Sequence, residues 1–355
     1  MIEIPNNVAS YVENGRKERA WHRLGQVFDG PLTVKEALEL SHADYRVEMQ
    51  QVFAVTPAIQ EAMEYGQVST DLILDALVQN RKATMRMDLN KPLGIVSDNY
   101  GIVQNEQAFQ FIDTLCTGGS GAPVIECAGV LGQGERVFIT AKFPEQIILD
   151  NKTDDRVDMY VVFTTSHDGT GAVNCMVTPT RVVCNNTLNY AMSHNAGKIS
   201  LRHTSGITDR LDLTRKENAE FAFRTLNMYN VYKKSLEESF EHLRNIRLSE
   251  KQLDDIIAQT ILSDANLKVY RECGIYHEDI SGVGRNQFLN IKNAMHHGVG
   301  QDICERGTAM WALNGLTTYF QNERNYRDEE LKFDSVTHGH AAKKVQQCYN
   351  LLVAA

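Results

Sequence analysis

The sequence predicts an α+β fold with a central antiparallel sheet, a long helix packed beside it and a helical C-terminal third. Residues 116–207 are rich in Val, Ile, Phe, Tyr and Thr, the residue types that favour strands. They include the strongest hairpin signal of the chain, SHDGTGAV at 166–173, which stands between two strand-like runs. From about residue 208, apolar residues recur at helical spacing instead. We therefore divide the chain into an N-terminal α/β region (1–115), a central antiparallel β region (116–207) and a helical C-terminal region (208–355).

The N-terminal region is predicted to hold short helices and strands. Thr33 can cap a helix at 33–41, and Glu36 stands three residues later as its capping-box partner. Alternation and helical spacing predict three further elements, a strand at 45–55 and helices at 70–80 and 105–115.

The other two regions supply the remaining elements. The central strands are predicted at 134–143, 157–166, 172–178 and 197–204. In the C-terminal region one apolar stripe runs from Ala222 to Leu243 at spacings of three and four residues, which predicts one long helix. Ser249 and Gln252 predict the capping box of the next helix, and two more helices are predicted at 307–323 and 340–354.

Composition limits the classes of function. The net charge of −9 gives no overall basic field that would recruit nucleic acid, so such a role needs a local basic patch. Seven cysteines without a C-x-x-C pair are typical of reduced thiols. We find no signal-peptide pattern and no apolar run long enough to span a membrane, so we expect a cytoplasmic protein. No Walker or Rossmann fingerprint is present, and no cofactor is predicted.

The segment TRVVCNNTLNYA at 180–191 predicts a strand that runs into a helix. Asn185 or Asn186 can cap that helix, in which case Arg181 pairs with a carboxylate and the junction is structural. The functional interpretation is that the helix N-terminus and the planar guanidinium of Arg181 together bind phosphate.

A local excess of positive charge follows. Between residues 181 and 216, six cations face only two carboxylates, which is the pattern of a groove that tracks a nucleic-acid backbone. The cations are Arg181, Lys198, Arg202, Arg210, Arg215 and Lys216. Arg202 and His203 are expected in a strand, so at most one of them faces such a groove. Alternatively, Arg210, Arg215 and Lys216 are only the solvent-exposed first residues of a helix.

Each of the other candidate functional residues also has a simpler structural explanation. Gly169 and Gly171 permit an anion-binding nest, but a plain β-turn explains them as well. Cys184 near His194 and His203 suggests a nucleophile, whereas a strand position favours a buried thiol. Two histidine pairs, His296-His297 and His338/His340, lack further metal ligands, so no metal site is predicted. Trp21 is expected to anchor the N-terminal arm or to contact another subunit.

Several short motifs, taken together, resemble one known family. They are WHRLG at 21–25, YGIVQNEQAFQFIDTL at 100–115, AGVLGQGERVFI at 128–139, SHDGTGAV at 166–173, TRVVCNNTL at 180–188, SLRHT at 200–204 and TAMWALNGLTTY at 308–319. The set is similar to the phage/plasmid-like protein family of unknown function, which is encoded by phages, prophages and plasmids. The resemblance implies a mobile-element protein that acts in replication, recombination or host defence, and it supplies no catalytic residues.

Three functional hypotheses follow. The first is a homo-oligomeric protein of phage or plasmid recombination or replication that holds single-stranded DNA in the basic groove, in a layout that resembles single-strand annealing proteins. The second is an interaction protein that blocks a host defence protein, because an acidic surface can occupy a basic site. The third is an enzyme that processes nucleotides or nucleic acid, centred on Arg181, Asn185 and His203. The absence of a catalytic motif favours a protein that is not an enzyme.

Overall fold

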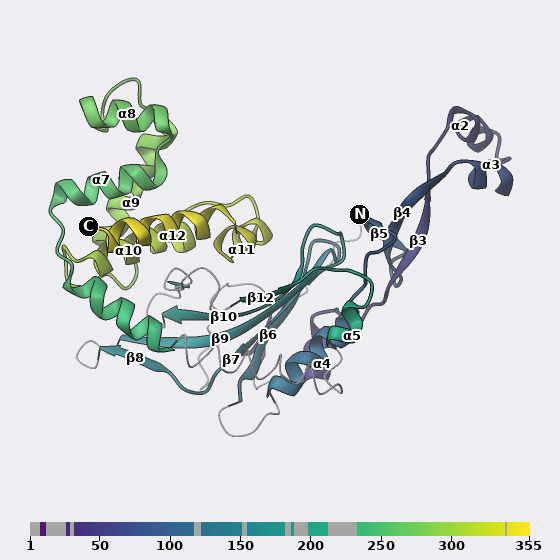
Figure 1. The fold of residues 1–355 in the computed structure, drawn as a ribbon, viewed down its shortest axis with the longest axis horizontal. Helices are drawn as coiled ribbons and strands as arrows, with labels where there is room; N and C mark the ends of the chain where they lie inside the picture. Colours follow the sequence, from purple (N-terminus) through teal and green to yellow (C-terminus); the bar gives the residue numbers. More distant parts are fainter. Residues whose placement is uncertain are drawn as a thin grey trace.

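The computed structural model describes residues 8–11, 26–28, 32–116, 122–150, 155–181, 186–187, 198–211, 233–337 and 339–355. These residues form a central sheet, an arm that projects from one end of the sheet, and a helical module at the other end (Figure 1). The sheets are antiparallel apart from one parallel pair, and the C-terminal part is helical, which confirms the predicted α+β class.

The central sheet is built around a meander that contains the predicted hairpin. Its strands are β1 (Val8–Tyr11), β2 (Gln26–Phe28), β6 (Val124–Leu131), β7 (Arg136–Lys142), β8 (Ile147–Asp150), β9 (Asp155–Ser166), β10 (Val173–Arg181), β11 (Asn186–Thr187) and β12 (Lys198–Leu201). The order is β11-β10-β9-β7-β6-β1-β2, with β12 paired to β10 and β8 to β9. The turn at 167–172 joins β9 to β10, as the Asp-Gly-Thr-Gly sequence predicted.

Both faces of this sheet are covered. On one face, α4 (Asn105–Cys116) lies against β7 and β9 and buries Phe109 and Ile112 completely. Beside it lie α1 (Val34–Leu40) and α5 (Ile207–Leu211). On the other face, Phe138 of β7 stacks on Phe333 of α11 (Glu329–Thr337), with the ring centroids 4.8 Å apart. Figure 1 shows α4 and α5 below the sheet and α11 above it.

The arm is a second sheet with two short helices at its far end. It consists of β3 (Val47–Phe53), α2 (Pro57–Glu64), α3 (Thr70–Asp75), β4 (Leu77–Arg86) and β5 (Lys91–Ser97), with strand order β3-β4-β5. The helix predicted at 70–80 is wrong beyond Asp75, because Leu77 and the residues after it pair with β3. The sequence prediction also missed α2, although Thr56 caps it and Pro57 opens it.

The hairpin turn between β9 and β10 is also where the arm packs against the central sheet. Thr84 Oγ1 donates a hydrogen bond to the carbonyl of His167 (2.6 Å), and the Tyr100 hydroxyl donates one to the carbonyl of Ser166 (2.7 Å). The backbone of Gly94 packs so closely on Asp168 that a Cβ at position 94 would lie 2.5 Å from the Asp168 Cα. The arm therefore meets the sheet through backbone contacts that leave no room for a side chain.

The helical module follows an unlabelled helix at 233–245. It contains α7 (Glu250–Ile261), α8 (Asp264–Cys273), α9 (Gly282–His297), α10 (Ala309–Thr318), the π-helix η3 (Tyr319–Glu323), α11 and α12 (His340–Val353). All ten residues of α10 are buried, as expected of a helix that is mostly apolar on every side. Leu236, Phe240 and Leu243 are buried, in agreement with the end of the predicted stripe, whose earlier part lies outside the described residues.

Both predicted capping boxes are present. The Thr33 side chain accepts a hydrogen bond from the Glu36 N–H, and the Glu36 side chain accepts one from the Thr33 N–H. Ser249 and Gln252 form the same pair of hydrogen bonds at the start of α7. Within the described residues, no helix has both the length and the hydrophobicity needed to cross a lipid bilayer.

Candidate nucleic-acid interface

Within the segment TRVVCNNTLNYA, the structure describes only residues 180–181 and 186–187, and these pair as two antiparallel strands. Asn186 and Thr187 are β11, which runs antiparallel to the end of β10 with Asn186 opposite Arg181. The prediction that Asn186 caps a helix is therefore wrong. Asn185 and Cys184 lie outside the described residues, as does Trp21.

Those predicted basic residues that the structure describes do not gather at one point. Arg181 ends β10, whereas Arg202 follows Leu201, which pairs with Val173 at the other end of the same strand. The two ends are eight residue steps apart along the strand, or roughly 26 Å. Lys198 opens β12 opposite Met176, between them.

The remaining predicted cations divide between α5 and the undescribed segment. Arg210 is exposed on α5, on the α4 side of the sheet, and Arg202 is exposed in the loop before α5. Arg215 and Lys216 lie outside the described residues.

His203 is a packed residue in the structure. β12 ends at Leu201, so the expectation that Arg202 and His203 lie in a strand is wrong. The His203 ring stacks on Tyr100 with centroids 4.7 Å apart, and its Nδ1 lies 2.9 Å from the carbonyl oxygen of Gly101. Burial lowers the pKa of His203 below its usual value, which favours the neutral ring. Its contacts join the loop before α4 to the sheet.

The Gly169-Thr170-Gly171 turn uses its own donors internally. The Thr170 N–H donates to Asp168 Oδ1 (2.8 Å), and the Gly171 N–H donates to Ser166 Oγ (3.0 Å). These two N–H groups are therefore engaged within the turn, which agrees with the plain-turn interpretation of the motif.

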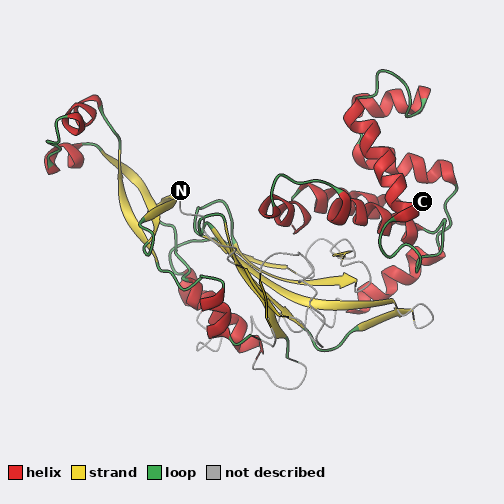
Figure 2. Ribbon diagram, turned by 180° about the vertical axis from the view of Figure 1, so that it is seen from behind, coloured by secondary structure: helices red, strands yellow, loops and turns green. Residues whose placement is uncertain are grey.

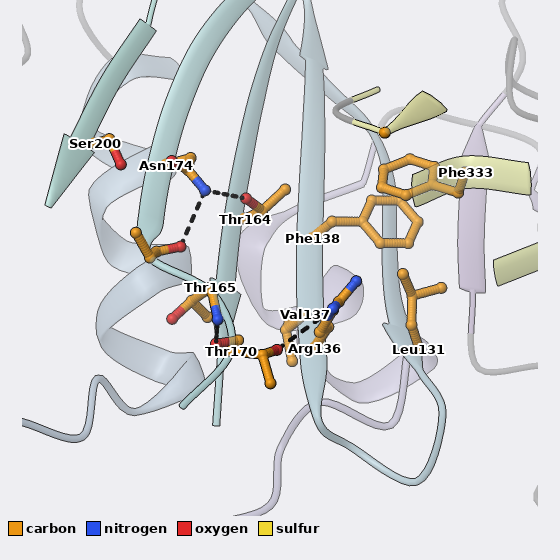
Figure 3. Close-up of a pocket in the computed structure, with 14 residues that line it drawn as sticks. Leu131, Arg136, Val137, Phe138, Thr164, Thr165, Thr170, Asn174, Ser200 and Phe333 are labelled. Carbon is orange, nitrogen blue, oxygen red and sulfur yellow. Dashed lines mark hydrogen bonds between the residues drawn. The ribbon is translucent and has the colours of Figure 1, made fainter. Parts of the chain in front are cut away.

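A cavity of about 400 Å³ opens beside this turn, on the face of the sheet that α11 covers. Leu131, Phe138 and Phe333 form an apolar wall. Hydroxyl, amide and guanidinium side chains from the strands and the β9–β10 turn form the polar side (Figure 3). The polar residues that line it are Arg136, Thr164, Thr165, Ser166, Thr170, Asn174 and Ser200. This volume lies within the range of small-molecule sites in proteins.

Hydrogen bonds orient the polar side of the cavity. Arg136 Nη2 donates to Thr170 Oγ1 (3.4 Å), and Thr170 Oγ1 donates to the carboxylate of Asp168 (2.8 Å). Asn174 Nδ2 donates to Thr164 Oγ1 (3.3 Å) and to the Ala172 carbonyl (3.0 Å). The Asn174 Oδ1 is buried and has no hydrogen-bond partner among the described residues.

Strand register brings this set together. Arg136 stands opposite Ser166, Phe138 opposite Thr164, and Asn174 opposite both Thr164 and Ser200. Directly opposed residues point to the same face of a sheet, so the four strands present these side chains together. The sequence signal for the site is modest. It consists of Thr, Asn and Ser residues at alternate positions of strands whose other residues are mostly apolar.

The other predicted chemistries find little support in the described residues. The six described cysteines form no disulfide with one another, and burial raises the pKa of Cys127 well above its usual value. His296 lies edge-on to Trp311, with centroids 5.1 Å apart, and no metal-binding group of three ligands occurs in the described part of the chain. His338 lies outside it.

The fold and the cavity define an α+β protein with a polar, arginine-containing cleft at one end of its central sheet. Residues 92–342 match the family model described as a domain of unknown function, DUF932, and the chain belongs to this family. No curated protein and no solved structure matches the chain.

Proposed function

We propose that the protein binds single-stranded nucleic acid during phage or plasmid recombination or replication, and that the cavity beside Arg136 receives one nucleotide of the strand. The observation that supports this most is the cavity's composition. A guanidinium and neutral donors stand on one side, and an apolar wall stands on the other. A nucleotide has the matching parts, an anionic phosphate and a base whose flat faces stack on apolar and aromatic side chains.

Each group has a role in this proposal. The planar fork of Arg136 suits phosphate oxygens, and its bond to Thr170 holds it at the mouth of the cavity. The hydroxyl of Ser200 adds a neutral donor. The buried Oδ1 of Asn174 has no partner among the described residues, an arrangement that costs about 1–3 kcal/mol, and an N–H group of a base would satisfy it after a small rearrangement.

The sheet end offers a path for the adjacent nucleotides. Arg202 lies two residues beyond Ser200, or about 7 Å along the chain, and its side chain is exposed. Contacts to phosphate from Arg136 and Arg202 with neutral donors between them carry no base code, so binding is sequence-tolerant. We place this activity in the host-cell cytoplasm, as expected for a protein encoded by a mobile element.

Binding of labelled oligonucleotides at a series of salt concentrations tests the proposal. We expect affinity for single strands that falls steeply with salt. Arg136→Ala is expected to weaken binding by roughly fivefold to tenfold and to reduce the slope of log K against log salt by about 0.7, the contribution of one phosphate contact.

The matched control is Arg271→Ala, which removes an exposed arginine from α8, away from the sheet. It should leave both affinity and slope unchanged. Absence of binding at low salt, or equal affinity for the two variants, would remove the basis of the proposal.

A further inference from the structure

A second cavity lies in the helical module, where α9 ends and α10 begins. Its volume of about 440 Å³ suits a small organic molecule rather than a single ion. The last turn of α9, residues of the loop at 298–306 and Trp311 of α10 line it. Figures 1 and 2 show α9 and α10 in the helical module, at the opposite end of the molecule from the arm.

The walls of this cavity are held in place by contacts among the two helices and the loop. The backbone at Gly298 is so close to α9 that a Cβ there would lie 2.4 Å from the Ala294 carbonyl oxygen. From α10, the Asn314 Nδ2 donates a hydrogen bond to the Gly300 carbonyl (3.3 Å). The cavity is therefore formed before a ligand arrives, and binding does not have to order the loop.

Two residues that line the cavity are almost fully buried and carry polar atoms without a partner. Gln301 is 6% exposed; its Nε2 donates to the carbonyls of Ala294 and Trp311, and its Oε1 is buried with no partner among the described residues. Trp311 is 2% exposed, and its indole N–H makes no hydrogen bond to any described residue. Because unpaired buried polar groups are unfavourable, this acceptor and this donor suit a ligand that pairs with them.

The rim of the cavity adds one cation and one carboxylate, Arg306 and Asp302. Both side chains are exposed, and neither has an ion-pair partner among the described residues. Glu305 lies between them in the sequence, but its carboxylate is paired with Arg247. The two unpaired groups match a ligand that offers both an anion and hydrogen-bond donors.

The histidine rings of α9 complete the lining. His296 is half-buried and lies edge-on to Trp311, with ring centroids 5.1 Å apart, which gives the cavity an aromatic side for a flat ring. His297 is exposed, and its Nδ1 lies 3.1 Å from Asn293 Oδ1. Burial raises the pKa of Glu323 in η3 and His297 acts on it in the opposite direction, so a further carboxylate lies near the cavity. These carboxylates disfavour a polyanion and favour a ligand with a single phosphate.

A guanine nucleotide matches these groups. A carboxylate only accepts hydrogen bonds, and guanine presents two adjacent donors, N1–H and N2–H, with the acceptor O6 beside them. Adenine has an acceptor in place of N1–H, so a carboxylate disfavours it. We infer that the cavity binds a free guanine nucleotide, with the guanine edge on Asp302 and Trp311 and the phosphate on Arg306. The Oε1 of Gln301 accepts the remaining N2–H after a small rearrangement. This inference does not depend on strand binding at the central sheet.

Calorimetric titration of the full chain with GMP and with AMP tests this site. We expect saturable binding of GMP that is about tenfold tighter than that of AMP, because adenine leaves the carboxylate unpaired. Arg306→Ala should weaken both nucleotides alike, by roughly tenfold, since both carry the phosphate. Asp302→Asn should weaken GMP alone and bring the ratio of the two affinities to about one, because an amide offers a donor and an acceptor that adenine can pair with.

Arg271→Ala, which removes the exposed arginine of α8, is the control and should bind GMP like the wild type. Circular dichroism checks that each variant is folded. Among the described residues the two cavities share no lining residue, so Arg306→Ala should keep the oligonucleotide affinity of the wild type.

Three results would overturn the inference. They are no GMP binding at millimolar concentration, equal affinity of the wild type for GMP and AMP, and loss of GMP binding in Arg136→Ala instead of Arg306→Ala. The third result would place the nucleotide at the central sheet. Failure of oligonucleotide binding, by contrast, would overturn only the function proposed for the sheet cavity.

Discussion

Gly94→Ala tests the joint between the arm and the central sheet. The added Cβ would lie 2.5 Å from both the Cα and the carbonyl oxygen of Asp168, where ordinary van der Waals contact begins near 3.4 Å. Both obstructing atoms belong to the backbone of the hairpin turn, so no rotamer change relieves the overlap. Forced overpacking of this kind costs about 1–3 kcal/mol. At about 2–4 °C per kcal/mol, the expected fall in melting temperature is roughly 2–12 °C.

Scanning calorimetry of two glycine variants measures this effect. Gly282→Ala is the control: its Cβ meets nothing within 4 Å, and the position is the first of α9, directly after the Ser281 cap. Alanine there should leave the melting temperature unchanged or raise it slightly. If Gly94→Ala has the same melting temperature as the wild type, the arm does not depend on close backbone packing against the β9–β10 turn.

Two further predictions concern the buried contacts of the sheet. Burial lowers the pKa of His167 to about 3, so the unfolded chain takes up a proton below about pH 6.5 that the folded protein does not bind; stability should fall as the pH drops from about 6.5 to about 3, by up to about 1.4 kcal/mol per pH unit. Urea unfolding at several pH values checks this, and a wild-type slope no steeper than that of His167→Gln would contradict it. Phe333→Ala removes the ring that stacks on Phe138 and should cost about 3–5 kcal/mol in the same assay, against less than about 0.5 kcal/mol for the exposed neighbour Leu331→Ala. A loss below 1 kcal/mol for Phe333→Ala would show that α11 does not depend on this contact.

Local chemistry explains which elements could be predicted from the sequence. The capping boxes at Thr33 and Ser249 and the Asp-Gly-Thr-Gly hairpin each depend on neighbours within a few residues, and the structure has them where predicted. Leu77 and the residues after it fit a helix by spacing, but pairing with β3 and β5 makes them a strand. Local propensity is weaker than such tertiary pairing.

In the described part of the chain, the cavity is lined by none of the residues that the sequence suggested as nucleic-acid contacts, because it depends on strand register. Arg136 and Ser200 are 64 positions apart, and they share a cavity only because β7, β9, β10 and β12 pair in one particular alignment. Conversely, Arg181 and Arg202 are close in sequence but lie at opposite ends of β10. A count of charges along the sequence cannot distinguish the two pairs. In an antiparallel sheet, residues close in sequence can lie at opposite ends of a strand, and residues far apart in sequence can lie side by side.

Photocrosslinking with an oligonucleotide that carries 5-bromouracil tests the proposed binding site most directly. After irradiation and proteolysis, mass spectrometry identifies the peptides attached to the strand. The proposed site predicts crosslinks within 131–138, 164–174 and 198–202, and a marked decrease at these peptides for Arg136→Ala. Crosslinks confined to α7–α9, or an unchanged pattern in the variant, would contradict a single strand in this cavity.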